Sequence, residues 1–506
     1  MTIRVPTVRN LKANLHDDRA ILGGKACGIQ RMMALGIPVP PAFNVSTQAC
    51  SDYRKAGGRL SDDVRQELPD AMAALEKITG RTFGSGDVPL LVSVRSGAAV
   101  SMPGMMDTIL NLGMTDKVQE SLALHTGDVA FAADARRRFE AQYAAIVGTS
   151  APPDPWNQLL GAIGAVFASW DSRRALAYRH SRGLDNEAGT AVTVQAMVFG
   201  NLDDKSGTGV LFSRDPRTGA REPFGEWLAC RQGEDLVSGT HDPQPLSDLA
   251  ITMPHVYAEL MRYAALLELQ DRDVQDIEFT VEAGRLWLLQ TRAAKRSPDA
   301  AVRLAVSFVE EGLLSPSEAL DLVAPDQVAA VLRAHIEPRA QAEAKVLARG
   351  RPACPGALSG TIVTDTERAQ SLAEAGQDVI LARPTTDPED VPAMSVVAAV
   401  VTEFGGSTSH AAVVAREMGV PCIVGCGEGT LMCLDGQTVT VDAALGEIYQ
   451  GTLSIVEPRD PTSAPDLAKL LRWARAEEGA DPAASLPQLL IGRRSEIPAA
   501  GRILFH

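Results

Sequence analysis

The sequence contains no apolar run long enough to cross a bilayer, and its first residues carry no apolar stretch of the kind found in signal peptides. Cysteine is sparse: there are seven in 506 residues, an odd number, with no CxxC pair. Neither disulfides nor a zinc site are therefore expected. The cysteines are expected to be reduced thiols in a cytoplasmic protein. The net charge of −15 at pH 7 argues against nucleic acid as the main partner. These absences predict a protein that binds neither a membrane nor a nucleic acid.

Length and composition indicate a globular chain of several domains. A chain of 506 residues is too long for one ordinary core, so two or three domains are expected. Hydrophobic residues at 45% and charged residues at 22% are typical of soluble proteins, and no internal repeat is visible. After about residue 456 the chain becomes rich in Pro, Ala and Asp. One helix is expected there over 467–478, in a tail that is otherwise mobile.

The segment around His410 has the pattern of a strand, a tight turn and a helix. The apolar run over 396–402 predicts a buried strand, and Gly405-Gly406 after it allows a sharp turn. The hydroxyl residues of 407–409 are good helix caps, and the helix behind them is expected to stop near Gly419. His410 would then lie in the first helical turn, where free N–H groups and the helix dipole favour an anion such as a phosphate on the imidazole. On this pattern alone, a helix cap or a surface histidine is the more common interpretation.

Two further segments have compositions that suit a phosphate site. Gly23-Gly24-Lys25 places a lysine beside flexible backbone, although the spacing of a Walker A motif is missing and a surface turn is the simpler interpretation. A strand over 90–97 carries Arg95 and leads into the methionine-rich stretch 101–107. Methionine prefers burial, so this stretch is either a flexible flap that closes over a ligand or a loop whose methionines pack beneath it.

The strongest local signal is a hairpin over 276–292. Period-two alternation puts Asp276, Glu278 and Thr280 on one face of the first strand, and Gln290 and Arg292 on one face of the second. Paired across the hairpin, these residues offer carboxylate and amide oxygens for Mg²⁺ and a guanidinium for phosphate oxygens. The alternative is an edge hairpin with a surface salt bridge.

Several of these segments, in the same order, resemble the pyruvate phosphate dikinase family. GGSTSHAAVVAREMG over 405–419 resembles the phosphohistidine signature, and VSVRSGAAVSMPGMMDTILNLG over 92–113 resembles the nucleotide-binding segment. The resemblance covers about residues 20–455. It implies an α/β (α+β) protein in which an ATP-grasp nucleotide-binding domain with a helical insert and connector (1–340) precedes a swivelling β/β/α phosphohistidine domain (341–456), with a tail over 457–506. Hinges are expected near 340–355 and 456. One departure is Glu403-Phe404, because the family usually has a basic residue before the two glycines.

The resemblance also implies roles for individual residues. ATP-binding residues are expected at eight positions: Lys25, Arg95, Met102, Gly104, Asp276, Glu278, Gln290 and Arg292. Two of them, Glu278 and Gln290, are expected to hold Mg²⁺. The catalytic residues implied are His410, Thr408, Arg95 and Arg292. His410 attacks phosphorus as a neutral imidazole, ATP yields AMP, and inorganic phosphate takes the γ group as pyrophosphate.

The resemblance also bears on the final acceptor of the phosphoryl group. The dikinases carry a C-terminal barrel for pyruvate and phosphoenolpyruvate, a fold of ~250 residues, whereas the tail here has about 50. The acceptor, pyruvate or another, is therefore expected in trans from a separate protein; a small acceptor bound between the two domains is the alternative. A drug phosphotransferase like the rifampicin enzyme and a non-catalytic nucleotide-sensing homologue are the rival functions, and the resemblance leaves a homodimer open.

Overall fold

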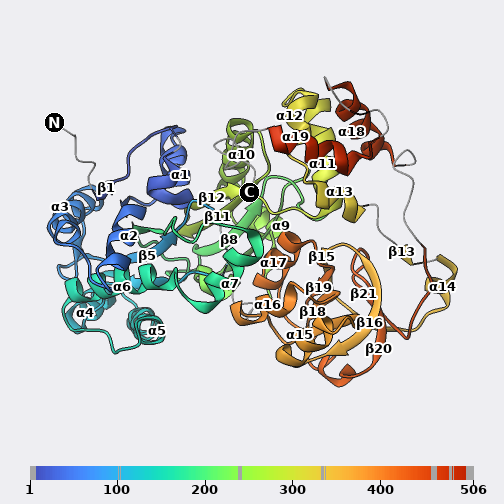
Figure 1. Cartoon of the computed structure of the whole chain (residues 1–506). Coiled ribbons are helices and arrows are strands. Elements are labelled where there is room, and N and C mark those ends of the chain that lie inside the picture. The colour runs from blue at the N-terminus through green and yellow to red at the C-terminus, as the bar shows by residue number, and fades with distance from the viewer. Residues whose placement is uncertain are drawn as a thin grey trace.

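The computed structural model describes residues 7–16, 18–100, 102, 104–237, 242–331, 335–336, 338–456, 464–477, 481 and 484–496. Within these ranges the protein is built on two five-stranded sheets in the first 300 residues and one eight-stranded sheet in the last third (Figure 1). Helices pack on all three sheets. The expected α/β class is confirmed.

The first sheet is antiparallel, has the order β1-β2-β7-β5-β6, and lies against a layer of helices. A large core fills the space between that layer and the sheet, because most inward residues of the strands and of the amphipathic helices are apolar. The strands are β1 (Val8–Asn10), β2 (Ala42–Val45), β5 (Val92–Gly97), β6 (Thr108–Leu112) and β7 (Ala191–Ala196), with a small pair β3 (Thr82–Phe83) and β4 (Pro89–Leu90). The helices are α2 (Thr47–Lys55), α3 (Asp62–Thr79), α4 (Asp116–Thr126), α5 (Val129–Val147), α6 (Pro155–Ser169) and α7 (Arg173–Arg182).

The second sheet, β10-β9-β8-β11-β12, is also antiparallel and contains the predicted hairpin. Ala283 and Gly284 both have positive φ, which is the geometry of a tight two-residue hairpin turn. α1 (Arg19–Ala34) and α10 (Pro254–Asp271) share a core with this sheet. Its strands are β8 (Gly207–Phe212), β9 (Phe224–Ala229), β10 (Gln244–Pro245), β11 (Gln275–Glu282) and β12 (Arg285–Ala293), and two short helices, α8 (Gly233–Val237) and α9 (Leu246–Thr252), lie along the same stretch. The two sheets with their helices are called the N-terminal unit below.

The eight-stranded sheet, with its helices, forms what is called the histidine unit below. Its order is β14-β21-β20-β16-β17-β18-β19-β15, parallel over β16 to β19 and antiparallel elsewhere. Its strands are β14 (Val346–Arg349), β15 (Arg351–Cys354), β16 (Ala357–Val363), β17 (Val379–Arg383), β18 (Ala399–Thr402), β19 (Cys422–Val424), β20 (Thr438–Asp442) and β21 (Glu447–Gln450). Its helical turns are α15 (Thr366–Glu374), η1 (Pro388–Asp390), α16 (Val391–Met394), α17 (His410–Met418) and η2 (Met432–Leu434).

The region around His410 folds as predicted, except at the start of the strand before it. α17 begins at His410 with Ser409 as N-cap and ends before Gly419, which takes the left-handed conformation. The strand expected over 396–402 begins only at Ala399, because the backbone of 395–397 still donates hydrogen bonds to the carbonyls of α16.

The connector and the tail come together in one helical cluster, at the upper right of Figure 1. Ser315 and Glu318 form a capping box at the start of α12. The tail helices α18 and α19 pack on the connector helices through buried leucines. The helices are α11 (Pro298–Glu310), α12 (Pro316–Asp321), α13 (Pro325–Val331), α18 (Pro465–Ala476) and α19 (Leu486–Glu496).

The chain enters and leaves the histidine unit side by side. β13 (His335–Ile336) pairs antiparallel with β22 (Ile455–Val456), and α14 (Pro338–Glu343) follows β13. The tail helix expected over 467–478 is seen as Pro465–Ala476. Residues 457–463, which follow the hinge expected near 456, lie outside the described residues.

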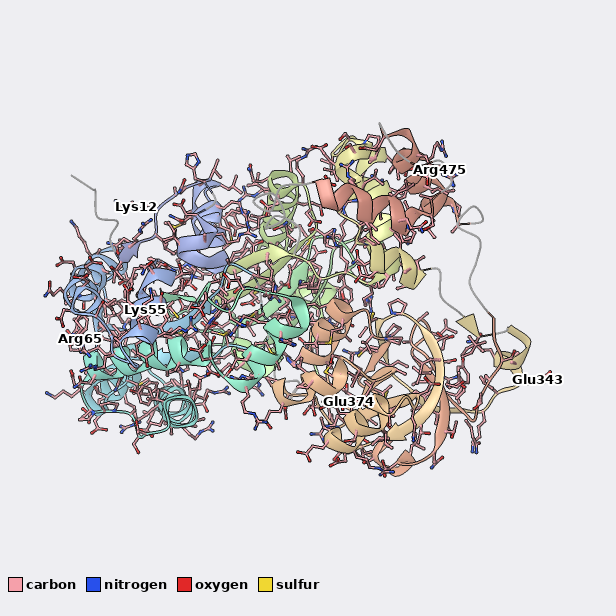
Figure 2. All side chains as sticks on the ribbon, in the orientation of Figure 1. Lys12, Lys55, Arg65, Glu343, Glu374 and Arg475 are labelled. Atoms are coloured by element: carbon pink, nitrogen blue, oxygen red, sulfur yellow. The ribbon has the colours of Figure 1, made fainter. Side chains whose placement is uncertain are left out.

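The described surface is charged and carries both signs. Figure 2 marks six exposed charged side chains that point away from the ribbon: Lys12, Lys55, Arg65, Glu343, Glu374 and Arg475. Among the helices that the structure describes, none combines the length and the apolarity that a bilayer span requires.

Candidate active site

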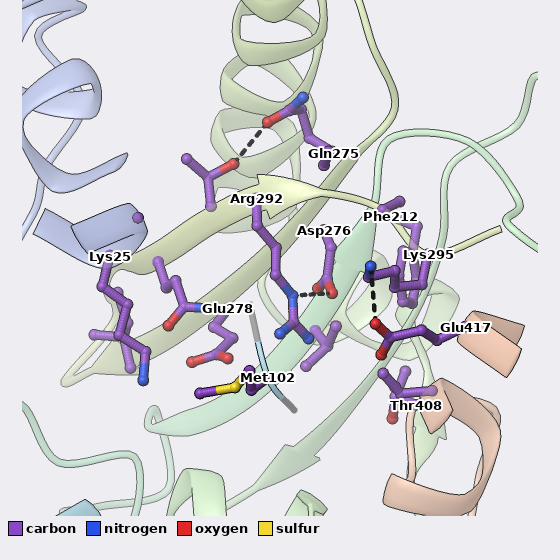
Figure 3. Close-up of a pocket in the computed structure, with 18 of the residues that line it drawn as sticks. Lys25, Met102, Phe212, Gln275, Asp276, Glu278, Arg292, Lys295, Thr408 and Glu417 are labelled. Atoms are coloured by element: carbon purple, nitrogen blue, oxygen red, sulfur yellow. Dashed lines mark hydrogen bonds and ion pairs between the residues drawn. The ribbon is translucent and has the colours of Figure 1, made fainter. Parts of the chain in front are cut away.

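A cavity of about 1140 Å³ lies between the two sheets of the N-terminal unit and the start of α17, and all ten residues expected in the site line it. They come from five places far apart in the chain. Lys25 is on α1, Arg95 on β5, and Met102 and Gly104 in the loop before β6. The hairpin β11–β12 supplies Asp276, Glu278, Gln290 and Arg292, and the start of α17 supplies Thr408 and His410. Figure 3 shows Lys25, Glu278 and Arg292 on one side and Thr408 on the other.

The two glycines before Lys25 determine its position. Gly23 has φ of 76° inside α1, and an added Cβ there would lie 1.6 Å from the carbonyl oxygen of Gly97. Only glycine allows this approach, and Gly24 N then donates to the carbonyl of Ala98 at 2.9 Å. The GGK segment is therefore a kink that fastens α1 to the end of β5, not the surface turn that was the simpler interpretation. This kink holds Lys25 in the cavity, near Arg95.

The hairpin pairs its charges in the predicted register. Asp276 lies opposite Arg292, and Glu278 opposite Gln290. Arg292 Nε donates to Asp276 at 2.8 Å, while Arg95 Nη2 donates to Glu278 at 2.7 Å and to Gln290 Oε1 at 3.4 Å. Burial alone would raise the pKa of Glu278, but Arg95, Arg292 and Lys25 hold it below its ordinary value. The site thus presents three basic side chains around a Glu278 carboxylate whose pKa is held low, an arrangement that suits a metal–polyphosphate complex.

Burial in the cavity, reinforced by Arg95, lowers the pKa of Lys25 to about 7, although Glu278 acts in the opposite direction. A bound triphosphate would restore the charge, so nucleotide binding should take up a proton between pH 7 and the ordinary lysine pKa of 10.5. At pH 8, calorimetry in two buffers of different ionisation enthalpy should show an uptake approaching about one proton per ATP. Affinity should fall as the pH rises above 7. Lys25→Met should abolish the uptake, whereas Lys12→Met, on the surface, should not; equal uptake in both variants would contradict the assignment.

Two methionines of the methionine-rich loop, Met102 and Met105, are buried between the two units. Met102 and Met105 pack with Trp170 and Tyr178 on one side and with apolar residues of the histidine unit on the other. The methionines are packed beneath the loop, as the second of the two sequence interpretations holds, and the loop also lines the cavity. Ser101 and Pro103 of this loop lie outside the described residues. The loop places Gly104 directly against the imidazole of His410.

Gly104 has φ of 71°, and an added Cβ would lie 2.4 Å from His410 Nε2. Gly104→Ala should therefore push the loop off the imidazole and slow phosphorylation of His410 by at least about tenfold, a change of ~1.4 kcal/mol in the barrier. Gly36→Ala is the matched control, because Gly36 has φ of 70° with no atom described within 4 Å of an added Cβ. Mass spectrometry of the phosphorylated chain over time measures both rates. Equal rates in the two variants would show that the loop does not need this contact.

His410 has the environment of a nitrogen nucleophile. Its Nε2 is covered and has no hydrogen-bond partner among the described residues, while Nδ1 lies 3.4 Å from Thr386 Oγ1. Burial lowers the pKa of His410, against the opposing charges of Asp387 and Asp390. The imidazole is therefore neutral at pH 7 and keeps a lone pair for attack on phosphorus.

Thr408 is held by a residue that the sequence analysis did not single out. Its Oγ1 donates to Glu226 Oε2 at 2.9 Å, and the backbone N–H of Ser407 donates to Glu226 Oε1 at 3.3 Å. Glu226 is buried on β9 of the N-terminal unit, so these bonds cross between the two units. The sequence offered no signal for this contact, because about 180 residues separate the partners.

Glu403, which departs from the family pattern, faces away from His410. Its Oε1 accepts hydrogen bonds from the backbone N–H groups of Leu431 and Met432, at 2.8 and 3.1 Å. These hydrogen bonds tie Glu403 to the turn at η2.

The donor set fits Mg²⁺ bound mainly through phosphate. In the part of the chain that the structure describes, no three His, Cys, Asp or Glu side chains gather as a metal cluster. Glu278 and Gln290 offer two side-chain oxygens that share Arg95 as a partner and so lie close together. Magnesium in phosphoryl-transfer sites usually takes one or two protein oxygens and completes its shell with phosphate and water. These two residues suit that role.

Comparison with known proteins first defines the class. Residues 58–249 match the family model described as "Pyruvate phosphate dikinase, AMP/ATP-binding domain", and residues 375–446 match "PEP-utilising enzyme, mobile domain". The chain thus combines a nucleotide-binding domain with the mobile domain of the phosphoenolpyruvate-utilising enzymes. These two domains and its relatives show that it belongs to the pyruvate phosphate dikinase family, as the sequence predicted.

The curated relatives are pyruvate, phosphate dikinases from bacteria and plants. That of Rhizobium meliloti (strain 1021) is 37% identical over 96% of this chain and 60% of its own length. That of Clostridium symbiosum is 37% identical over 90% of this chain and 59% of its own length. For pyruvate, phosphate dikinase 1, chloroplastic, of Arabidopsis thaliana the identity is 38%, over 90% of this chain and 53% of that protein. The chain therefore spans only part of the length of these relatives.

Proposed function

We propose that the protein is an ATP-dependent phosphotransferase of the pyruvate phosphate dikinase type, which transfers the β-phosphoryl group of ATP to His410. The observation that carries this proposal is the position of His410 Nε2, which is covered, has no hydrogen-bond partner among the described residues, and lies in the same cavity as Lys25, Arg95 and Glu278. A nucleophile, a cationic phosphate site and a pair of metal-suited oxygens therefore meet in one enclosed space.

The proposed step forms a bond between Nε2 and the β-phosphorus of ATP and breaks the bond from that phosphorus to the oxygen of the α-phosphate, so AMP leaves. Inorganic phosphate then takes the γ-phosphoryl group and leaves as pyrophosphate. One phosphoryl group, the β group, stays on His410. The overall products are AMP, pyrophosphate and phosphohistidine.

The side chains of the cavity have distinct roles in this proposal. Lys25, Arg95 and Arg292 hold the triphosphate and offset the negative charge that moves between its oxygens. Glu278 and Gln290 hold Mg²⁺, which neutralises phosphate charge when bound. Asp276 orients Arg292, and Met102 and Gly104 close the cavity against water. Thr408 fixes the turn before His410 through Glu226.

The acceptor meets the phosphohistidine away from this cavity. In the arrangement seen here, Nε2 is covered by the loop at Gly104, so no acceptor reaches it from outside. The histidine unit must therefore move from the nucleotide site before it can deliver the group, and the paired strands β13 and β22 mark where the chain crosses between the units. We propose that pyruvate or another acceptor, supplied by a separate protein, then receives it.

Intact-mass analysis tests the proposal. Incubation with ATP, Mg²⁺ and inorganic phosphate should add one phosphoryl group to the chain and release AMP and pyrophosphate in equal amounts. Omission of phosphate should stop pyrophosphate release. Release of ADP instead of AMP would contradict the dikinase scheme, and an unmodified chain with no AMP would favour the nucleotide-sensing alternative.

A further inference from the structure

A second polar contact joins the two units at the far end of the histidine-bearing helix. Glu417 lies seven residues after His410 on α17, and Lys295 lies three residues after Arg292, just past the end of β12. Lys295 Nζ lies 3.1 Å from Glu417 Oε1, and the hydroxyl of Tyr178 on α7 donates to the same carboxylate. Figure 3 shows Lys295 and Glu417 meeting beside Thr408 at the edge of the cavity.

The contact is buried and carries charge. The Glu417 side chain is 7% exposed and that of Lys295 is 22% exposed, while Tyr178 is buried. Because Glu417 belongs to the histidine unit and both partners to the N-terminal unit, separation of the units would break both interactions at once. A charge that loses a buried partner must be solvated again or remain uncompensated. This contact therefore favours the arrangement in which the two units are docked.

We propose that Glu417, Lys295 and Tyr178 form a docking clamp that holds α17 against the nucleotide cavity, so that Glu417 is a positioning residue for His410. This inference rests on the proposed function only where it treats His410 as the reacting group. Glu226 already holds the turn before α17, through Thr408 and the backbone of Ser407.

Glu226 and the clamp together fix the orientation of α17, which a single contact does not. The clamp lies seven residues along the helix from His410, about 10 Å at 1.5 Å per residue. Because α17 packs on β15 and β19, the histidine unit moves with it. With Glu226 alone as a polar contact, the whole unit could pivot about the first turn of α17 and swing Nε2 away from Gly104. With both ends held, the helix axis is fixed, and so is the direction in which Nε2 points. The clamp also ties this direction to the strand that carries Gln290 and Arg292.

The test uses the reactivity of His410 without nucleotide, so it does not depend on phosphoryl transfer. Diethyl pyrocarbonate modifies neutral imidazole, and the docked arrangement covers Nε2. Peptide mass spectrometry gives the modification rate of His410 in the full chain. Glu417→Gln and Tyr178→Phe should raise this rate, the first by about tenfold or more, because a hydrogen bond to a charged group contributes more than one factor of ten in an equilibrium constant. Glu428→Gln, on an exposed turn of the same unit, is the matched control and should leave the rate unchanged.

Exchanging the charges of Lys295 and Glu417 shows whether a variant exposes His410 by undocking the units or by destabilising the whole fold. Lys295→Glu places two carboxylates together and should expose His410 more than Glu417→Gln does. Adding Glu417→Lys to Lys295→Glu should restore protection towards that of the original chain, with the thermal midpoint unchanged. Glu226→Ala serves as a positive control for undocking. If Glu226→Ala speeds modification while neither Glu417→Gln nor Lys295→Glu does, the clamp is overturned and the proposed function is untouched.

Discussion

ATP labelled in the β-phosphate is expected to label His410, and ATP labelled in the γ-phosphate is expected to label pyrophosphate, at saturating inorganic phosphate. The reason is the order of bonds in the proposed step, in which AMP leaves from the β-phosphorus and phosphate removes the γ group. The label should reach one β-phosphoryl group per chain. It should be lost in acid, as a phosphoramidate is, and should be found on the peptide that contains His410.

Two variants sharpen this experiment. His410→Gln removes the nucleophile and should abolish labelling, while His125→Gln, exposed at the end of α4, should label like the original chain. Because the pKa of His410 is held below its ordinary value of 6.5, labelling should not fall between pH 8 and pH 7 through protonation of this imidazole. Label on His410 from the γ position alone would rule out the dikinase scheme and leave a simple ATP-dependent histidine kinase.

The second large effect is expected at Glu278. Glu278→Ala should slow phosphorylation of His410 by at least about a hundredfold, because charge stabilisation by a metal ion contributes several kcal/mol and each 1.4 kcal/mol is about a factor of ten. Glu278 also pairs with Arg95 at 2.7 Å, so its loss frees a guanidinium beside the phosphates. Single-turnover kinetics over a range of Mg²⁺ concentrations measure both the rate and the apparent metal affinity.

Glu278→Gln separates charge from shape, since the amide keeps the size of the side chain and loses its negative charge. It should resemble Glu278→Ala in rate and retain the thermal stability of the original chain. Arg285→Ala, exposed at the far end of the same hairpin, is the matched control and should keep the full rate. An unchanged rate for Glu278→Ala at saturating Mg²⁺ would show that the hairpin is only structural.

The contacts between the two units must break when the histidine unit moves from the nucleotide cavity to an acceptor. Buried contacts at Glu226 and at the docking clamp hold the histidine unit over the nucleotide, yet delivery to an acceptor requires the unit to leave. Both contacts are polar, and polar groups find new partners in water when they separate. The two units also share apolar contacts through Met102 and Met105, and this apolar surface must be exposed when the histidine unit leaves.

Local elements of this protein were determined by the sequence. The end of the helix after His410 follows from Gly419, and the capping box at Ser315 follows from residue type and spacing. The register of Asp276 with Arg292 follows from alternation along a hairpin. Each depends on residues close together in the chain, whose backbone hydrogen bonds and side-chain periodicity act locally. The family signature identified the remaining candidates, including Lys25, for which spacing alone gave only a weak signal.

The tertiary structure alone decided how these elements meet. Nothing near Gly104 in the sequence shows that its α-carbon must face an imidazole about 300 residues away, and nothing near Glu226 or Lys295 identifies Thr408 or Glu417 as a partner. The direction of Glu403 was equally hidden, because its backbone partners come from a turn that the sheet brings back beside it. Contacts between distant segments depend on the packing of whole sheets and helices, and a local pattern of residues carries no record of that packing.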